Sequence, residues 1–224
     1  MIAPAARPPV VAIDGPSGVG KGTVSRAVAR ALGYRHIDTG AMYRAVAWLA
    51  LRQGVALDDE QAVTEVATRA RLEVDSGAVS VDGHDVTNAI RTAEMDRAAA
   101  GVARLPRVRA VLVERQRALG RDGGVVMEGR DIGTVAFPDA AVKIYLVASP
   151  DERARRRAAD PAHAGPTRAL SDVATALAAR DQSDATRAVS PLVIAPDAVL
   201  VDTTGVAIEE VVDRVLAIVR NTPG

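Results

Sequence analysis

A glycine-rich loop between an apolar run and a helical pattern constrains the fold of this chain more than any other feature. The apolar run covers residues 10–13, and apolar residues at helical spacing cover residues 23–32, just before Gly33. The loop between them contains Gly15, Pro16, Ser17, Gly18, Val19, Gly20, Lys21, Gly22 and Thr23. A strand, this loop and a helix in this order predict a phosphate-binding loop, because its backbone N–H groups and the positive helix end attract phosphate oxygens.

Lys21 is the residue of this loop that we expect to reach the terminal phosphates of a bound nucleotide. The chain has 28 basic residues, and because Lys21 and Lys143 are its two lysines, the other 26 are arginines. A lysine in such a chain indicates a place where a compact ammonium must fit between phosphates. The alternative is a glycine-rich turn that only permits a tight junction between strand and helix. In the common form of this loop, Ser or Thr follows the lysine directly. Here Gly22 takes that place and the hydroxyl comes one position later, on Thr23, so we do not expect Thr23 to ligate a metal directly.

Strand and helix patterns alternate along most of the remaining chain. Apolar runs predict further buried strands at residues 125–127 and 142–147 and a last strand at 199–201. Helical spacing predicts helices over residues 41–52, 58–69, 108–119 after Pro106, 150–157 after Ser149, 167–180 and 208–220. Period-two spacing over residues 72–86, with turn signals at 75–77 and 82–83, predicts a small antiparallel insertion. We therefore expect an α/β fold in which helices cover a central parallel sheet.

The composition excludes several classes of protein. The absence of cysteine removes disulfides, thiolate metal sites and a thiol nucleophile, and favours a reducing compartment, with the cytoplasm as the expected location. The 28 basic residues balance 28 acidic ones, which argues against a nucleic-acid partner. The longest apolar runs, such as residues 45–51, are too short to span a membrane. We expect a protein without a membrane or nucleic-acid partner, and a monomer.

Four further motifs follow the loop. They cover residues 38–44 (DTGAMYR), 106–109 (PRVR), 128–134 (EGRDIGT) and 180–187 (RDQSDATR), and Pro191-Leu192 comes after the last. The sequence contains no N-K-x-D string for guanine recognition. Together with the loop, this set closely resembles the bacterial cytidylate kinases, a family of nucleoside monophosphate kinases. The resemblance extends from about residue 10 to residue 220.

The resemblance implies the overall organisation and the substrates. It implies one domain over residues 1–224, with a three-layer P-loop core formed by residues 10–40, 106–152 and 165–220. It also implies a monophosphate-binding segment with an antiparallel β insertion at 41–105 and a short lid at 153–164. The expected reaction moves the terminal phosphate of ATP onto CMP or dCMP in the presence of Mg²⁺. The family often has a serine near the cytosine where this chain has Ala100, so one hydroxyl that contacts the base is missing.

The resemblance also implies the roles of individual residues. The catalytic residues would be Lys21, Arg130, Arg153 and Arg157, the last two closing over the donor phosphates. The residues that bind the acceptor would be Thr39, Arg44, Arg109, Arg130, Asp131, Arg180, Asp184 and Arg187. Within this second set, Arg44, Arg130 and Arg187 would grip the acceptor's phosphate, since a guanidinium binds phosphate bidentately.

The other members of that set would contact the nucleoside. Arg180 and Asp184 resemble the family's ribose contacts, although they could instead form an i, i+4 pair on a helix. Arg109 and Asp131 resemble the pair that reads the base. Asp38, at a strand end, could help to position the acceptor or could cap the following helix.

The metal site has two candidates. Glu128 ends an apolar strand, where a carboxylate can hold the water shell of Mg²⁺, and Asp202 ends another. We favour Glu128, acting through water. The spacing of His36, His84 and His163 matches no metal site, so we treat them as bystanders.

Two other functions fit a phosphate-binding loop. One is a small kinase for a non-nucleotide metabolite, such as a shikimate-type enzyme, which the arginine set and the antiparallel insertion oppose. The other is a nucleotide-dependent switch that binds a partner, which the missing guanine motif and the second phosphate clamp oppose.

Overall fold

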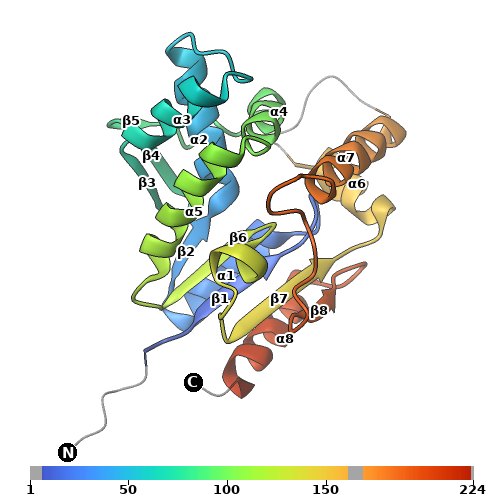
Figure 1. Ribbon diagram of the computed structural model, residues 1–224. Helices are drawn as coiled ribbons and strands as arrows, with labels where there is room; N and C mark the ends of the chain where they lie inside the picture. Colours follow the sequence, from blue (N-terminus) through green and yellow to red (C-terminus); the bar gives the residue numbers. More distant parts are fainter. Residues whose placement is uncertain (1–6, 161–168, 223–224) are drawn as a thin grey trace, which may run out of the picture.

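The central sheet explains where the site lies. The computed structural model describes residues 7–160 and 169–222, and in this part of the chain the central sheet has five parallel strands in the order β2-β6-β1-β7-β8 (Figure 1). The strands are β1 (Val10–Asp14), β2 (Arg35–Asp38), β6 (Val125–Gly129), β7 (Val142–Val147) and β8 (Val199–Asp202). Because β1 is the middle strand, the glycine-rich loop that follows it starts at the centre of the sheet's carboxyl edge.

Helices cover both faces of the sheet, and this follows from the alternation of side chains along its buried strands. On β1, Val11 and Ile13 pack in one core with α1 (Lys21–Leu32) and α8 (Ile208–Asn221). Ala12 points to the other face, where it packs with α2 (Thr39–Arg52) and α5 (Pro106–Gly120). The three layers confirm the α/β fold expected from the sequence.

A second, antiparallel sheet confirms the expected insertion. It consists of β3 (Leu72–Asp75), β4 (Ala78–Val81) and β5 (His84–Asp85), and it stands beside α2 and α3 (Glu60–Arg69) in Figure 1. The turns fall at the predicted places, and each begins with a residue of positive φ, Ser76 at 48° and Asp82 at 50°. The Ser76 amide donates to the His36 carbonyl at 3.0 Å, which attaches this sheet to β2.

Several elements differ from the sequence expectations, and three of them bear on the site. Helix α4 (Ala93–Val102) was not predicted, although the Thr92 hydroxyl caps it by accepting from the Met95 amide at 3.1 Å. A π-helix, η1 (Ile132–Ala136), follows β6 and was also not predicted. Helix α7 (Leu170–Ala185) continues five residues beyond the expected end at Arg180, so most of the motif at 180–187 is helical.

The expected lid lies partly within the described residues. Its first residues, from Arg153, belong to α6 (Pro150–Ala158), and residues 161–164 lie outside the described part of the chain, as do His163 and the Gly165-Pro166 break. The division into core, monophosphate-binding segment and lid therefore stays a prediction. No helix in residues 7–160 or 169–222 is long and apolar enough to cross a membrane.

Candidate active site

A cavity of about 530 Å³ lies where β1, β2 and β6 end and α4, α6 and α7 approach them (Figure 1). Open α/β sheets bind ligands at this carboxyl edge. Most of the predicted site residues line it. They are Ser17, Gly18, Gly20, Lys21, Gly22, Thr23, Thr39, Arg44, Arg109, Glu128, Arg130, Asp131, Arg157, Arg180, Asp184 and Arg187. The structure thus brings together residues that the sequence distributes over 170 positions, from Ser17 to Arg187.

The glycine-rich loop has a backbone conformation that glycine adopts readily. Gly15, Gly18 and Gly20 have φ values of 147°, 82° and 95°, which side-chain-bearing residues rarely adopt. A Cβ atom at Gly15 would also clash with the carbonyl oxygen of Leu146 on β7. These glycines therefore let the backbone turn sharply from β1 into α1.

The ammonium group of Lys21 lies inside this loop. Its Nζ donates to the carbonyl oxygens of Gly15 at 2.8 Å and Pro16 at 2.6 Å, and the residue is 7% exposed. Burial holds the pKa of Lys21 well below its ordinary value, and the nearby Arg130 guanidinium lowers it further. An anionic ligand would reverse this effect, because phosphate oxygens stabilise the charged ammonium.

Glu128 is a buried carboxylate at the end of β6 that lines the same cavity as the loop. It is 6% exposed, and its Oε1 atom lies 2.9 Å from His36 Nε2, while the Thr39 hydroxyl donates to its carbonyl oxygen at 2.7 Å. His36, which was treated as a bystander, contacts this candidate metal carboxylate across two neighbouring strands, and its part in the function stays a prediction. A Cβ atom at Gly22 would lie 3.3 Å from Glu128 Oε1, so a larger residue after the lysine would crowd this carboxylate.

The described residues fit a magnesium site that depends on bound phosphates. Among residues 7–160 and 169–222 no group of three or more His, Asp or Glu side chains is arranged to hold a metal ion. Glu128 could contribute one carboxylate at the cavity, which suits Mg²⁺, since this ion keeps several waters and uses one or two carboxylates besides phosphates. Asp202, the rival candidate, is exposed and accepts from the Thr204 amide at 2.8 Å, outside the set of described cavity residues.

Arg109 and Asp131 form a buried ion pair beside α4. Arg109 is 2% exposed; its Nη2 donates to Asp131 Oδ2, and its guanidinium lies 5.4 Å from the centre of the Tyr43 ring. Ala100, where the family often has serine, lines the same cavity. The structure thus confirms that the two motifs meet here, which the resemblance implied.

Asp184 connects two of the three arginines of the expected phosphate clamp. Its Oδ2 accepts from Arg130 Nε at 3.0 Å, and its Oδ1 lies 3.6 Å from Arg187 Nη1. Arg180 Nη1 donates to Asp96 of α4 at 3.1 Å. Asp184 and Arg180 thus both bind residues outside α7, which is more than the i, i+4 helix pair considered as the alternative.

Asp38 holds the third arginine of the clamp. Its Oδ2 accepts from Arg44 Nη2 at 2.8 Å, and its Oδ1 accepts from the Ala41 amide at 2.9 Å. Burial alone would raise the pKa of Asp38, but the Arg44 guanidinium and the Ala41 N–H hold it below its usual range. The expectation that Asp38 caps the following helix is confirmed, because the Ala41 contact is the cap of α2.

Helix α6 contacts the glycine-rich loop through its arginines. Arg153 donates to the Ser17 carbonyl at 3.2 Å and to Asp181, and Arg157 donates to the Ser17 hydroxyl at 2.9 Å. Arg156, which was not singled out, binds the Val19 carbonyl at 3.1 Å. The arginines expected at the donor phosphates therefore already lie against the loop.

Comparison with known proteins decides the family. A family model described as cytidylate kinase matches residues 11–221. The chain belongs to the cytidylate kinase family. It is 50% identical over 211 residues to the cytidylate kinase of Desulfitobacterium hafniense (strain Y51), covering 93% of this chain and 91% of that protein. It is also 50% identical over 218 residues to the cytidylate kinase of Geobacillus sp. (strain WCH70), covering 96% and 97%.

A solved structure supports the fold alone. The structure of an uncharacterized protein from Eubacterium ventriosum ATCC 27560 superimposes with a TM-score of 0.51 at 8% identity, covering 95% of this chain and 98% of that one. Such a likeness indicates a shared fold and says nothing about the reaction.

Several polar residues near the site were missed by the sequence reasoning. Asp14 accepts from the amides of Ile132 and Gly133 at 2.9 and 2.8 Å, and Asp181 accepts from the Ser17 amide at 3.1 Å. Asp181 stands inside a quoted motif, so its position was available as a signal. Asp96 was missed together with α4, the helix that carries it.

Proposed function

We propose that this protein moves the terminal phosphate of ATP onto CMP or dCMP, giving ADP and CDP or dCDP. The observation that carries the proposal is a single cavity lined by a phosphate-loop lysine, a set of arginines and the buried Arg109–Asp131 pair. Family membership supports the same reaction. A kinase for a nucleotide acceptor needs these three parts, since it must bind two phosphate groups and one base.

The loop would hold the ATP phosphates. Phosphoryl transfer needs positioning and positive charge more than proton chemistry. The backbone N–H groups of the loop and Lys21 would bind the terminal phosphates, and Arg153 and Arg157 would add charge from α6. Mg²⁺, held through water by Glu128, would neutralise charge on the phosphates when bound.

The acceptor's phosphate would lie between Arg44, Arg130 and Arg187. One of its oxygens attacks the terminal phosphorus of ATP, the bond from that phosphorus to the bridging oxygen breaks, and ADP leaves. Asp184 would keep Arg130 and Arg187 in place, because it binds both guanidinium groups in the structure. Arg180 and Asp184 would also face the ribose, and Thr39 would orient the acceptor through its hydroxyl.

The buried pair would read the base. Cytosine has an exocyclic amine that donates and a ring nitrogen that accepts, whereas uracil reverses both. Asp131 can accept from the amine through Oδ1, and Arg109 can donate to the ring nitrogen. A wrong base leaves buried polar groups unpaired, which costs roughly 1 to 3 kcal/mol of binding free energy for each group. CMP should therefore be preferred to UMP even though Ala100 supplies no hydroxyl to the base.

We also propose that the enzyme is a monomer that acts in the cytoplasm on small-molecule substrates. A shikimate-type kinase and a partner-binding switch were the other functions considered, and membership of the cytidylate kinase family opposes both. A coupled assay of ADP release tests the proposal with CMP, dCMP, UMP, AMP and shikimate as acceptors. We expect turnover with CMP and dCMP above that with UMP; turnover with shikimate, or ADP release that no acceptor stimulates, would contradict it.

A further inference from the structure

Asp96 is the point where arginines from three different helices meet. Its Oδ1 lies 3.7 Å from Arg44 Nη1 of α2, and its Oδ2 lies 3.3 Å from Arg157 Nη1 of α6 and 3.1 Å from Arg180 Nη1 of α7. The carboxylate lines the cavity, and its side chain is 15% exposed. One negative charge is therefore shared among these cations.

Two of the three arginines belong to the parts of the proposed site that would hold phosphate groups, and the third would face the ribose of the acceptor. Arg44 belongs to the proposed phosphate clamp, Arg157 binds the Ser17 hydroxyl of the donor loop, and Arg180 reaches from α7. Without an anion, three guanidinium groups so close together repel one another. Asp96 thus supplies the charge that a phosphate group would bring.

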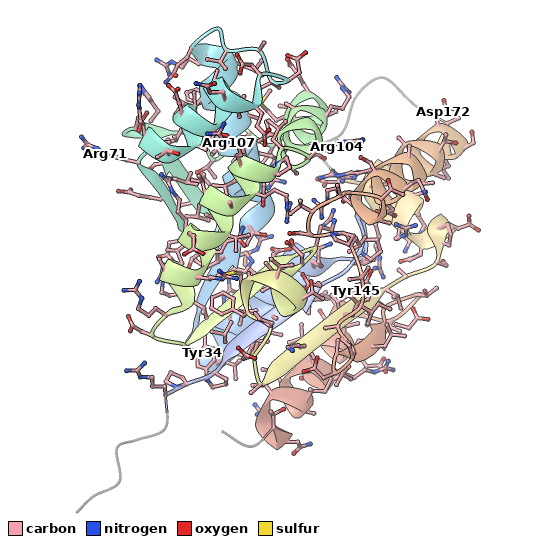
Figure 2. The ribbon with its side chains drawn as sticks, viewed as in Figure 1. Tyr34, Arg71, Arg104, Arg107, Tyr145 and Asp172 are labelled. Atoms are coloured by element: carbon pink, nitrogen blue, oxygen red, sulfur yellow. The ribbon has the colours of Figure 1, made fainter. Side chains whose placement is uncertain are left out.

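The position of Asp96 in α4 stabilises its charge independently of the arginines. It stands in the first turn of the helix, where the unpaired N–H groups favour a carboxylate. The helix is also tied to α7 by Arg104, labelled in Figure 2, which donates to the Ser183 hydroxyl at 3.3 Å. The position of this carboxylate in the cavity is therefore set by the backbone of α4, which is itself held against α7.

We propose that Asp96 is a specificity-determining residue, an internal counter-anion that occupies these arginines until a phosphate dianion displaces it. A carboxylate has one charge and two oxygens, whereas a phosphate dianion has two charges and three free oxygens, so it competes successfully. A nucleoside without phosphate brings no negative charge that could displace Asp96 from the arginines. This inference rests on the proposed function for the roles of Arg44 and Arg157.

Removing the charge of Asp96 should tighten the binding of every phosphate-bearing acceptor. The arginines would no longer be neutralised by the protein, and a charge-assisted hydrogen bond gained by the ligand corresponds to roughly a tenfold change in affinity. A carboxylate that instead accepts from the ribose 2′-hydroxyl would behave differently, because its loss would weaken CMP and spare dCMP.

The test is titration calorimetry of the full-length protein and of Asp96→Asn, without ATP. The ligands are CMP, dCMP, inorganic phosphate and cytidine. The matched control is Asp172→Asn, because Asp172 is also in the first turn of a helix and is exposed at the far end of α7 in Figure 2. Asp96→Ser gives the same test if the Asn variant does not fold, and Asp96→Glu, which keeps the charge, should retain the weaker affinity.

We expect Asp96→Asn to bind CMP, dCMP and phosphate about tenfold more tightly, with cytidine unchanged and Asp172→Asn like the wild type. Unchanged or weaker phosphate affinity would overturn the proposal, as would a selective loss of CMP relative to dCMP. A wild-type protein that fails to bind CMP would contradict the proposed function instead. The titration with inorganic phosphate would still test the role of Asp96 in that case, because phosphate binding needs only the arginines.

Discussion

His36 Nε2 lies 2.9 Å from Glu128 Oε1, and both side chains are buried between the neighbouring strands β2 and β6. The Nδ1 atom of His36 has no hydrogen-bond partner among the described residues. Burying a ring nitrogen that carries no hydrogen costs less free energy than burying an unpaired N–H group. Nε2 therefore carries the ring hydrogen and donates a hydrogen bond to Glu128. The imidazole therefore fixes one carboxylate oxygen in place next to the loop.

This relationship gives the first prediction. His36→Leu removes the donor and should raise the Mg²⁺ concentration needed for half-maximal turnover by about tenfold, as is common when a residue that orients a metal-binding group is lost. His36→Gln should recover part of the loss, because its amide can donate. The measurement is the rate as a function of Mg²⁺ at saturating nucleotides. A Mg²⁺ dependence that His36→Leu leaves unchanged would refute a positioning role.

Lys21 and Lys143 provide a matched pair for testing transition-state charge. Lys21→Met should keep its fold by circular dichroism and lose about 10² to 10³ in turnover, as expected for a preorganised electrostatic contact. Lys143 is equally buried, but its Nζ binds Asp197 at 2.7 Å. Lys143→Met should therefore lower stability with little effect on turnover per folded molecule. Near-normal turnover in Lys21→Met would show that Lys21 does not stabilise charge in the transition state.

Base selection depends on Asp131 if the buried pair reads cytosine. Asp131→Asn keeps the shape but replaces one acceptor with a donor, so kcat/KM should fall far more for CMP than for UMP. Arg187→Ala should lower both values alike, because it would hold only the phosphate. The measurement is the ratio of the two kcat/KM values in each variant. An unchanged ratio in Asp131→Asn would show that this residue does not contact the base.

Asp14 should make stability depend on pH. Burial raises the pKa of Asp14 to about 6 from 3.8, against the lowering effect of the Gly133 and Ile132 amides. The folded state then binds this proton more tightly than the unfolded state, so Asp14 contributes stability that is present below pH 4 and lost as pH rises to about 6. The loss amounts to about 3 kcal/mol.

Urea unfolding from pH 4 to pH 7 measures this contribution. The difference in unfolding free energy between the wild type and Asp14→Asn should change across that range, and Asp122→Asn, at an exposed position after α5, should show no such change. A difference that is constant with pH would mean that Asp14 titrates normally.

Local sequence signals predicted the parts of the fold that depend on neighbouring residues. The glycine-rich loop, the strands β1, β6 and β7, and the two turns of the antiparallel sheet have turn residues and apolar spacing that act over a few positions. Helix α4 was missed although alanines favour a helix and Thr92 caps it, because few large apolar residues mark its buried face, which packs on α2. The π-helix depends on tertiary contacts, since its first two amides donate to the Asp14 carboxylate at the end of β1.

The site residues were also predictable only in part: the motifs identified them, but their contacts depend on the tertiary fold. Motifs indicated Arg109 and Asp131, and the structure shows them in contact. The partners of the arginines could not be predicted, because Asp96 and Asp184 meet them only after α4, α6 and α7 come together. The role of His36 required knowledge that β2 pairs with β6, a register that no local pattern specifies.

Transfer of labelled phosphate from γ-labelled ATP tests the central claim most directly. With CMP as acceptor and Mg²⁺ present, the label should appear in CDP in equal amount to the ADP formed, with little in inorganic phosphate, and replacing CMP by UMP should reduce the transfer severalfold. Label that appears only in inorganic phosphate, or transfer that is equal for CMP and UMP, would contradict the account.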